Sequence, residues 1–208
     1  MLNNKYRLRD AVPYAVNLLI QKMREAVDTG LGRLTGAWWK VGIGKSVAFR
    51  GLPIFRRHPT ARIKIGDHCI FNSAQWSNTI GLNRRCIISA TRGAEIDIGN
   101  HSGFSGTVIA ASERIVIGHR VLCGGNCTIV DTDRHPLEME ARIRKEQPQS
   151  QPITIEDDVF LGMNVTVLKG SHIGKGSVIA ANSVVAGRIP AGVIAAGSPA
   201  KAIKTLST

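Results

Sequence analysis

An aliphatic residue recurs at every sixth position over a long stretch of the C-terminal half of the chain. The stretch reads IEDDVF, LGMNVT, VLKGSH, IGKGSV, IAANSV and VAGRIP, so its first column holds Ile155, Leu161, Val167, Ile173, Ile179 and Val185. A period of six fits neither the 3.6-residue repeat of an α-helix nor the alternation of a hairpin sheet. It predicts a parallel β-helix, in which three short strands close one coil and the aliphatic column stacks into a continuous core.

Two further columns of the repeat are restricted in size. The fifth column is small enough to fit where two faces of a coil meet, with Val159, Val165, Ser171, Ser177 and Ser183. The second column is often glycine or alanine, as at Gly162, Gly174, Ala180 and Ala186. We expect this second column to supply unusual backbone torsions at the corners, which glycine adopts readily.

The same six-residue frame returns upstream, starting at Ile65, Ile98 and Ile117, and is irregular between Ser77 and Glu95. A chain of 208 residues is too short for two substantial cores. We therefore expect a mainly β protein, organised as a basic helical segment over residues 1–40, a β-helix over 41–190 and a C-terminal tail over 191–208.

The N-terminal segment predicts an α-helix. Asp10 is positioned to cap it, and Gly30 and Gly32 to end it. Its apolar residues recur at helical spacing, at Val12, Val16, Leu19, Met23 and Val27. We expect the helix to pack on the coil or on a neighbouring subunit rather than to enter a bilayer, and Trp38 and Trp39 to cover the first coil.

The basic surplus of the chain is concentrated at its N-terminus. The net charge is +12; residues 1–64 hold 13 basic and 3 acidic residues, and the remainder holds 14 and 12. No zinc-finger spacing, RNA-binding motif or clear helix-turn-helix accompanies this charge, so we expect no nucleic-acid partner. A solvated surface is the simplest interpretation, and peripheral contact with anionic lipid or binding of a polyanionic substrate stays open.

No stretch of the sequence has the length of a membrane span or the pattern of a signal peptide, which predicts a cytoplasmic protein, membrane-peripheral at most. The four cysteines, Cys69, Cys86, Cys123 and Cys127, lack paired metal-ligand spacing. We expect them to be reduced, and we expect no metal.

A polar segment, DTDRHPLEMEARIRKEQPQSQP over residues 131–152, interrupts the repeat between two regular stretches. It should loop out from the coil. Long loops on rigid scaffolds often carry function.

The isoleucine–glycine hexapeptides, the loop sequence DTDRHPLEMEARI and the ending IPAGVIAAGSPAKAIK closely resemble the hexapeptide-repeat acyltransferases over about residues 41–204. Maltose, galactoside and polysaccharide O-acetyltransferases are the most similar branches. The resemblance implies a left-handed β-helix, a homotrimer with active sites between subunits, and acetyl-CoA as donor. It predicts an acetyl-CoA-dependent O-acetyltransferase that acts on a saccharide hydroxyl in surface polysaccharide biosynthesis.

By the same resemblance, His135 is the catalytic base. A neutral imidazole can take the proton of a sugar hydroxyl as the oxygen attacks the thioester, and can return it to the CoA thiolate. Asp131 and Asp133 would orient the ring if the segment is extended, and turn hydrogen bonds are an equal alternative. Arg134 would meet an acidic sugar, a phosphate or only solvent.

The resemblance also places Ser105 and Asn126 as ligands of the acceptor, although both residue types suit corner turns. It assigns the CoA groove to the late coils and the C-terminal turn, at Gly162, Met163, Ala180, Ala181, Ser198, Lys201 and Lys204. Corner geometry and a solvated tail are the alternatives for these residues.

Two other functions stay open. N-acetylation of an amino or nucleotide sugar uses the same kind of histidine base. A non-catalytic trimeric solenoid is the second alternative. Its metal-binding form would need the dispersed histidines to converge, among them His101, His119, His135 and His172.

Overall fold

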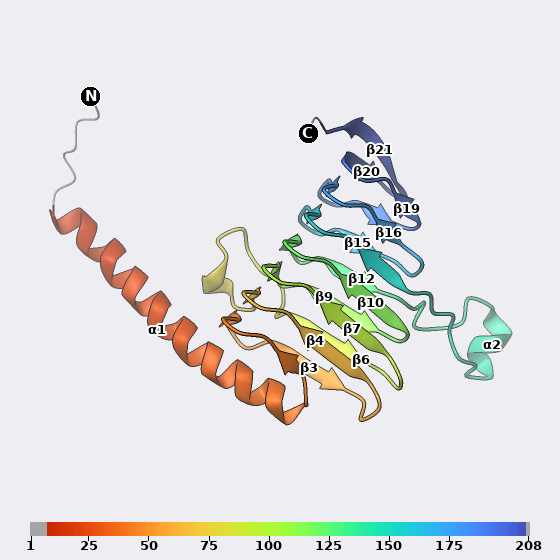
Figure 1. The fold of residues 1–208 in the computed structure, drawn as a ribbon, viewed down its shortest axis with the longest axis horizontal. Coiled ribbons are helices and arrows are strands. Elements are labelled where there is room, and N and C mark those ends of the chain that lie inside the picture. The colour runs from red at the N-terminus through yellow and green to blue at the C-terminus, as the bar shows by residue number, and fades with distance from the viewer. Residues whose placement is uncertain (1–7, 207–208) are drawn as a thin grey trace.

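The computed structural model describes residues 8–206, and their side chains from residue 11 onward. The chain winds through three parallel sheets, A, B and C, in that order, and then returns to A (Figure 1). We name the three edges of this prism the A/B, B/C and C/A corners. Sheet A holds seven strands, so the coil makes six full turns between its first and last strand.

The strands are short throughout. Sheet A contains β1 (Gly42–Ile43), β4 (Arg62–Ile65), β7 (Glu95–Ile98), β10 (Arg114–Ile117), β13 (Ile153–Ile155), β16 (His172–Ile173) and β19 (Arg188–Ile189). Sheet B contains β2 (Ala48–Arg50), β5 (Ile70–Asn72), β8 (Gly103–Ser105), β11 (Leu122–Gly125), β14 (Phe160–Leu161), β17 (Val178–Ile179), β20 (Val193–Gly197) and β21 (Ala200–Thr205). Sheet C contains β3 (Ile54–Arg57), β6 (Ile87–Ala90), β9 (Val108–Ala111), β12 (Thr128–Val130), β15 (Thr166–Val167) and β18 (Val184–Val185).

The six-residue column forms the core as predicted. Ile155, Leu161 and Val167 lie on sheets A, B and C in turn, and Ile173 lies in register beside Ile155 one coil later. All six residues of the column are fully buried. Each turn therefore repeats the same inward side chains, and stacking buries them against their own equivalents.

The prediction for the second column is wrong. The left-handed torsions fall on the fourth column instead, at Asp158, Asn164, Gly170, Gly176 and Asn182. Gly162 and Gly174 are small for a different reason, since an added Cβ would lie 2.6 Å from the Ala181 nitrogen and 2.5 Å from the Ala191 nitrogen. The backbone of the next coil leaves no room there.

The four cysteines are free, as expected, and buried, so they pack as small hydrophobes. Burial raises the pKa of the Cys127 thiol to about 11. It also holds the pKa of the Cys123 thiol well above its ordinary value.

The N-terminal helix is longer than predicted. α1 (Leu8–Trp38) begins before Asp10 and continues through Gly30 and Gly32. Gly32 serves packing instead, because an added Cβ would lie 2.5 Å from the Phe49 ring. Trp39 packs against the core, whereas Trp38 is 83% exposed and covers nothing in this chain.

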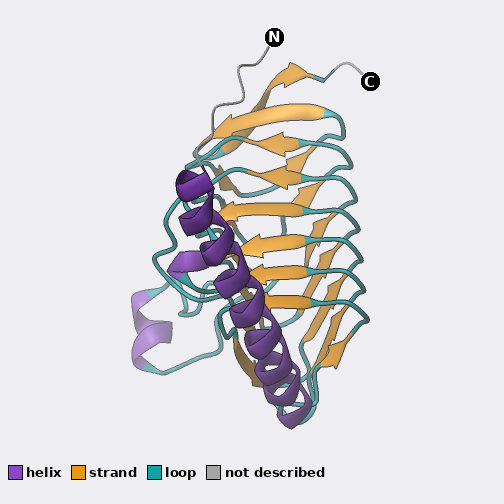
Figure 2. Cartoon of the chain, turned by 90° about the vertical axis from the view of Figure 1, so that its left-hand side faces the viewer, coloured by secondary structure: helices purple, strands orange, loops and turns teal. Residues whose placement is uncertain are grey.

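Two segments leave the coil at its corners. Residues 73–86 leave at the B/C corner and contain η1 (Gln75–Ser77), and residues 131–152 leave at the C/A corner and contain α2 (Met139–Ile143). In Figure 1, α2 projects from the side of the coil away from α1, and Figure 2 shows α1 crossing the coil obliquely.

The residues after 190 continue the coil. β20 joins sheet B, and β21 folds back on β20 as an antiparallel strand. Within residues 8–206, no helix combines the length and the apolar character needed to cross a bilayer.

Candidate active site

The long loop is pinned at its base. Thr132 and Ser150 form an antiparallel bridge across the two ends of residues 131–152. The Gln151 N–H donates to the Asp131 carbonyl at 2.9 Å. The segment between them is therefore held on a closed neck at the C/A corner.

Asp131 is fully buried at this neck. Its carboxylate accepts hydrogen bonds from the backbone N–H groups of Ser112 and Glu113, at 2.6 and 2.8 Å. These two residues form the C/A corner of the coil below. The carboxylate thus ties the loop to the coil below through residues 18 and 19 positions away, and makes no local turn.

Asp133 pairs with a residue that the sequence analysis missed. The Lys169 ammonium lies 2.5 Å from the Asp133 carboxylate, and both side chains are about one-fifth exposed. Lys169 also donates to the Gln149 side chain at 3.3 Å. The sequence did offer a signal for this pair: Lys169 is a basic residue at the C/A corner one coil above the acidic start of the loop.

His135 lies beyond this neck and is exposed. It follows Arg134, whose φ of +64° is unusual for a side chain with a Cβ and turns the backbone sharply. Within residues 11–206, no hydrogen bond or ion pair reaches the His135 ring, so neither Asp131 nor Asp133 orients it in this chain. The ring is free to meet a ligand.

An open cavity of about 730 Å³ lies under the loop. Two arginines and several hydroxyl groups line it, with Thr91, Arg92, Ser112, Thr132, Arg134 and Ser150 among the lining residues. Neither Arg92 nor Arg134 has an ion-pair partner in the part of the chain whose side chains are described. Guanidinium groups beside hydroxyl groups are suited to carboxylate or phosphate oxygens.

The predicted acceptor ligands lie at a different corner. The Ser105 hydroxyl accepts hydrogen bonds from the side chains of Asn72 and Asn78, at 3.0 and 3.1 Å. The Asn126 side-chain oxygen accepts from the Asn83 N–H at 2.9 Å. Both residues thus hold the loop of residues 73–86 at the B/C corner, and sheet C separates them from His135.

The four small or flexible residues predicted for the cofactor continue the same B/C corner upward. Gly162 and Met163 lie one coil below Ala180 and Ala181, since the Gly162 N–H donates to the Ile179 carbonyl and the Asn182 N–H to the Met163 carbonyl. This edge carries few bulky side chains, so an extended ligand could approach its backbone.

The C-terminal lysines lie on one face of their strand. Lys201 and Lys204 pair with Ala196 and Ile194 of β20, and an irregularity at Ile203 shifts the alternation by one residue. Because Ile194 and Ala196 share the outward face, both lysines also point outward, and Ser198 is exposed in the turn between the strands. The strand therefore presents two cations, Lys201 and Lys204, on its outward face.

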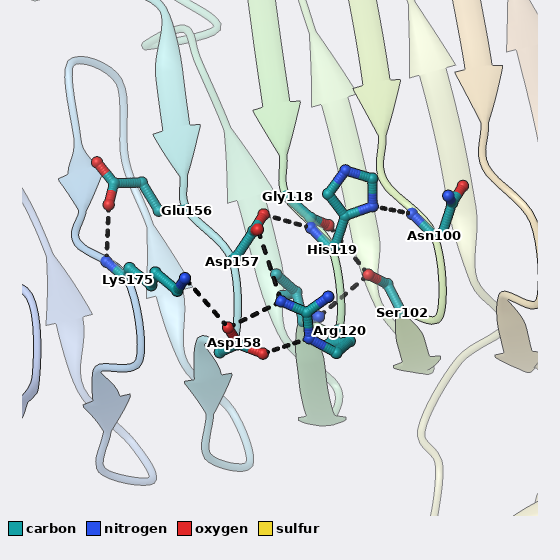
Figure 3. A network of polar contacts seen from close by, with 10 residues as sticks. Asn100, Ser102, Gly118, His119, Arg120, Glu156, Asp157, Asp158 and Lys175 are labelled. Atoms are coloured by element: carbon teal, nitrogen blue, oxygen red, sulfur yellow. Dashed lines mark hydrogen bonds and ion pairs between the residues drawn. The ribbon is translucent and has the colours of Figure 1, made fainter. Parts of the chain in front are cut away.

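A polar network links successive coils at the third corner, A/B (Figure 3). The Asn100 N–H donates to the His119 ring at 2.9 Å, and the His119 N–H donates to the Asp157 carboxylate at 2.8 Å. Arg120 pairs with Asp158 at 2.5 Å and lowers the pKa of that carboxyl by hydrogen bonding. These polar groups meet one another's hydrogen-bonding needs between successive coils.

The dispersed histidines make separate contacts within the chain. His68 and His101 stack in parallel with ring centroids 4.7 Å apart, and His172 donates to Glu156 at 2.7 Å. Within residues 8–206, no group of three or more histidine, cysteine or acidic side chains is arranged to hold a metal ion.

Comparison with known proteins supports the repeat independently. Residues 152–187 match the family described as Bacterial transferase hexapeptide (six repeats). The chain is 56% identical over 61 residues to a 2,3,4,5-tetrahydropyridine-2,6-dicarboxylate N-acetyltransferase of Clostridium perfringens, covering 29% of this chain. The match spans about a quarter, 26%, of that relative's length.

Solved structures share the fold at low sequence identity. The polysialic acid O-acetyltransferase OatWY superposes with a TM-score of 0.63 and 22% identity, covering 81% of this chain and 76% of that one. An N-acyltransferase from Bacillus cereus, in complex with dTDP and coenzyme A, gives a TM-score of 0.62 and 16% identity, covering 83% and 88%. The predicted resemblance and fold are confirmed: the chain carries the bacterial transferase hexapeptide repeat and has the left-handed β-helix fold of the hexapeptide-repeat acetyltransferases.

Proposed function

We propose that the protein is an acetyl-CoA-dependent O-acetyltransferase that acts on a saccharide hydroxyl, with His135 as the general base. The observation that carries the proposal is the position of this histidine. Its ring is exposed and unpaired in the described chain, on a loop pinned to a rigid coil. The preceding residue, Arg134, lines the open cavity of about 730 Å³, whereas His135 lies outside that lining. A base that must meet two substrates needs such access.

His135 would move one proton twice. Bound acetyl-CoA would supply a thioester carbonyl. The neutral His135 ring would take the proton of the acceptor hydroxyl as the oxygen bonds to that carbonyl carbon. The resulting imidazolium would then give the proton to the sulfur as the carbon–sulfur bond breaks, which restores the neutral ring.

We propose a homotrimer with each active site between two subunits. The separation of the predicted residues supports it: His135 lies at the C/A corner, whereas Asn126, Met163 and Ala181 follow the B/C corner. A neighbouring subunit could bring one corner of each kind together. The loop also exposes apolar side chains for such a contact, with Leu137, Met139 and Ile143 exposed by 68%, 65% and 73%.

The acceptor is proposed to be an acidic or phosphorylated saccharide of a surface polysaccharide. Arg92 and Arg134 line the cavity without ion-pair partners in the described chain. Two such cations favour a carboxylate or phosphate over a neutral sugar. Because the proposed donor is acetyl-CoA, we place the reaction in the cytoplasm.

A screen of acetyl-CoA thiol release tests the proposal. The purified protein would be given matched pairs of neutral and acidic saccharides, amino sugars and nucleotide sugars, and free thiol would be measured with a chromogenic disulfide. The buried cysteines keep the protein's own background low, since burial raises the pKa of the Cys127 thiol to about 11.

The chemical stability of the product then distinguishes O-acetylation from N-acetylation. Hydroxylamine cleaves an acetyl ester and leaves an acetamide intact. An ester formed only on acidic saccharides is the expected product. An acetamide on an amino sugar would replace O-acetylation by N-acetylation, and no thiol release with any acceptor would contradict the proposed activity.

A further inference from the structure

The helix α1 packs on the coil with its face of small and polar residues, and not with its apolar face. Gly32 and Gly36 are buried against the first coil, and the Thr29 hydroxyl accepts the Phe49 N–H at 3.0 Å. An amphipathic helix usually buries its apolar stripe against the core. Here small and polar residues make the contact.

The large apolar residues of α1 remain exposed. They form a stripe with i, i+3 and i+4 spacing, which we define as Val12, Val16, Leu19, Ile20, Met23, Val27, Leu31, Leu34 and Trp38. Every member is between 41% and 83% exposed. At 3.6 residues per turn, the stripe lies opposite the face marked by Gly32 and Gly36. The packing on the coil therefore leaves it uncovered along the whole helix.

The acidic side chains of α1 that the structure describes are bonded to the coil, and so is one basic side chain, Arg33, which donates to the Gly44 carbonyl at 2.9 Å. Glu25 pairs with Arg50 at 2.6 Å, and the Asp28 carboxylate accepts the Gly51 N–H at 2.7 Å, so both acidic side chains are turned to the coil. Lys22 and Arg24 are exposed on either side of the stripe, and the Arg24 guanidinium also lies 5.9 Å from the centre of the Trp76 ring. A surface that meets the apolar stripe therefore also meets positive charge.

We propose that the stripe of α1 docks in the plane of an anionic lipid surface. A helix with one long apolar face and basic flanks lies in the interfacial region, with its apolar side chains among the acyl chains and its cations at the headgroups. A tryptophan at the end of the stripe, as at Trp38, suits the level of the headgroups. The loop with His135 projects from the other side of the coil and stays accessible (Figure 1).

A second copy of the chain is the competing occupant, and the flanks argue against it. Helices that pair along an apolar seam usually carry both signs of charge beside the seam, so that opposite charges meet. The flanks of this stripe show Lys22 and Arg24, while Glu25 and Asp28 are engaged by the coil.

Vesicle co-sedimentation of the full-length protein tests the proposal. Vesicles of phosphatidylcholine alone would be compared with vesicles containing about one-third phosphatidylglycerol, at low and high salt. We expect binding to the anionic vesicles that weakens with salt. The double variant Met23→Gln/Val27→Gln should bind about 100-fold more weakly, at about tenfold for each apolar side chain withheld from lipid.

The matched control is Ala11→Gln/Ala15→Gln, which places the same number of glutamines on an exposed, less apolar side of the same helix. It should bind like the wild type, and circular dichroism should show equal helix content in all three proteins. Absence of wild-type binding to anionic vesicles, or equal loss in the control, would overturn the proposal.

Sedimentation velocity without lipid distinguishes the second copy. If Met23→Gln/Val27→Gln lowers the oligomeric state in buffer, the stripe covers another subunit and the lipid assignment is wrong. An unchanged oligomeric state together with lost vesicle binding supports it. Neither readout depends on acetyl transfer, so the result stands apart from the proposed enzymatic function.

Discussion

The A/B and C/A corners of the same coil use polar side chains in opposite ways. At the A/B corner, His119, Arg120 and Asp158 are bonded to groups of neighbouring coils (Figure 3). At the C/A corner, Asp131 and Asp133 hold the neck of the loop, while Arg134 and His135 extend beyond it unpaired in the described chain.

This difference shows how a repetitive scaffold can carry a site. Regular corners stack at the spacing of parallel strands, so their polar groups find partners one coil away. The inserted loop breaks that stacking, and its side chains lack such partners. A polar residue at a corner is therefore a candidate for chemistry mainly where the repeat is interrupted.

The largest expected effect comes from the unpaired histidine. His135→Ala should lower acetyl transfer by about 10² to 10⁴-fold, the usual span for a lost general base, with little change in stability. Thiol-release kinetics and thermal unfolding would measure the two quantities. His119→Ala is the matched control at the other corner, and it should keep nearly full activity. Equal losses in both variants would remove the proposed distinction.

Removal of the buried Asp131 carboxylate from the neck of the loop should lower the free energy of unfolding. Asp131→Ala leaves the N–H groups of Ser112 and Glu113 without their acceptor. A buried unsatisfied donor costs about 1–3 kcal/mol. Because these two N–H groups are only partly buried, we expect the free energy of unfolding in urea titrations to fall by about 2–3 kcal/mol, toward the low end for two donors. Asp131→Asn keeps one acceptor oxygen and should lose less. Unchanged stability with lost activity would instead assign Asp131 to orienting His135.

The Lys169–Asp133 pair should hold the loop in position without contacting the substrates. Lys169→Met removes a pair only about one-fifth exposed and loosens the loop base. Because small misplacements of a catalytic group slow the reaction, we expect kcat to fall about tenfold with KM nearly unchanged. The double variant Lys169→Met/Asp133→Asn should be no worse than the single one, since the two residues act together. Additive losses would show separate roles.

The smallest effect is expected at the A/B corner. Arg120→Ala should leave activity unchanged and alter stability only slightly, because the Arg120–Asp158 pair is solvent-exposed. Arg120 lowers the pKa of Asp158 in the folded state, so the contribution of the pair is present at neutral pH. It is lost progressively as the pH falls from about 4, the ordinary pKa of the carboxyl group, through the lower pKa of the folded state. Urea titrations of both proteins at pH 7 and pH 3 should therefore converge at the lower pH.

Much of the coil could be predicted from the sequence, and less of the site. The inward column from Ile155 to Val185 was predictable because every unit repeats the same local pattern. The exposure of His135 followed from its place in a polar interruption. The pairing of Asp133 with Lys169 was not predictable, because the two residues lie 36 positions apart in the sequence. Whether they come into contact depends on the path of the loop between them.

The outward direction of the α1 stripe was also beyond the sequence pattern. Apolar spacing from Val12 to Val27 identifies a face of a helix, whereas Gly32, Glu25 and Asp28 decide which face meets the coil. Those contacts depend on the shape and charge of the first coil, with which the helix must pack.

The sequence by itself determined the six-residue period, the three-sided core and the loop that interrupts it, because these features arise from short-range repetition and burial. The tertiary structure alone decided which corners hold the predicted residues, which acidic groups are already bonded, and which face of α1 stays uncovered. The physical reason is that those contacts join residues of different coils, and the corner lengths between them set the register.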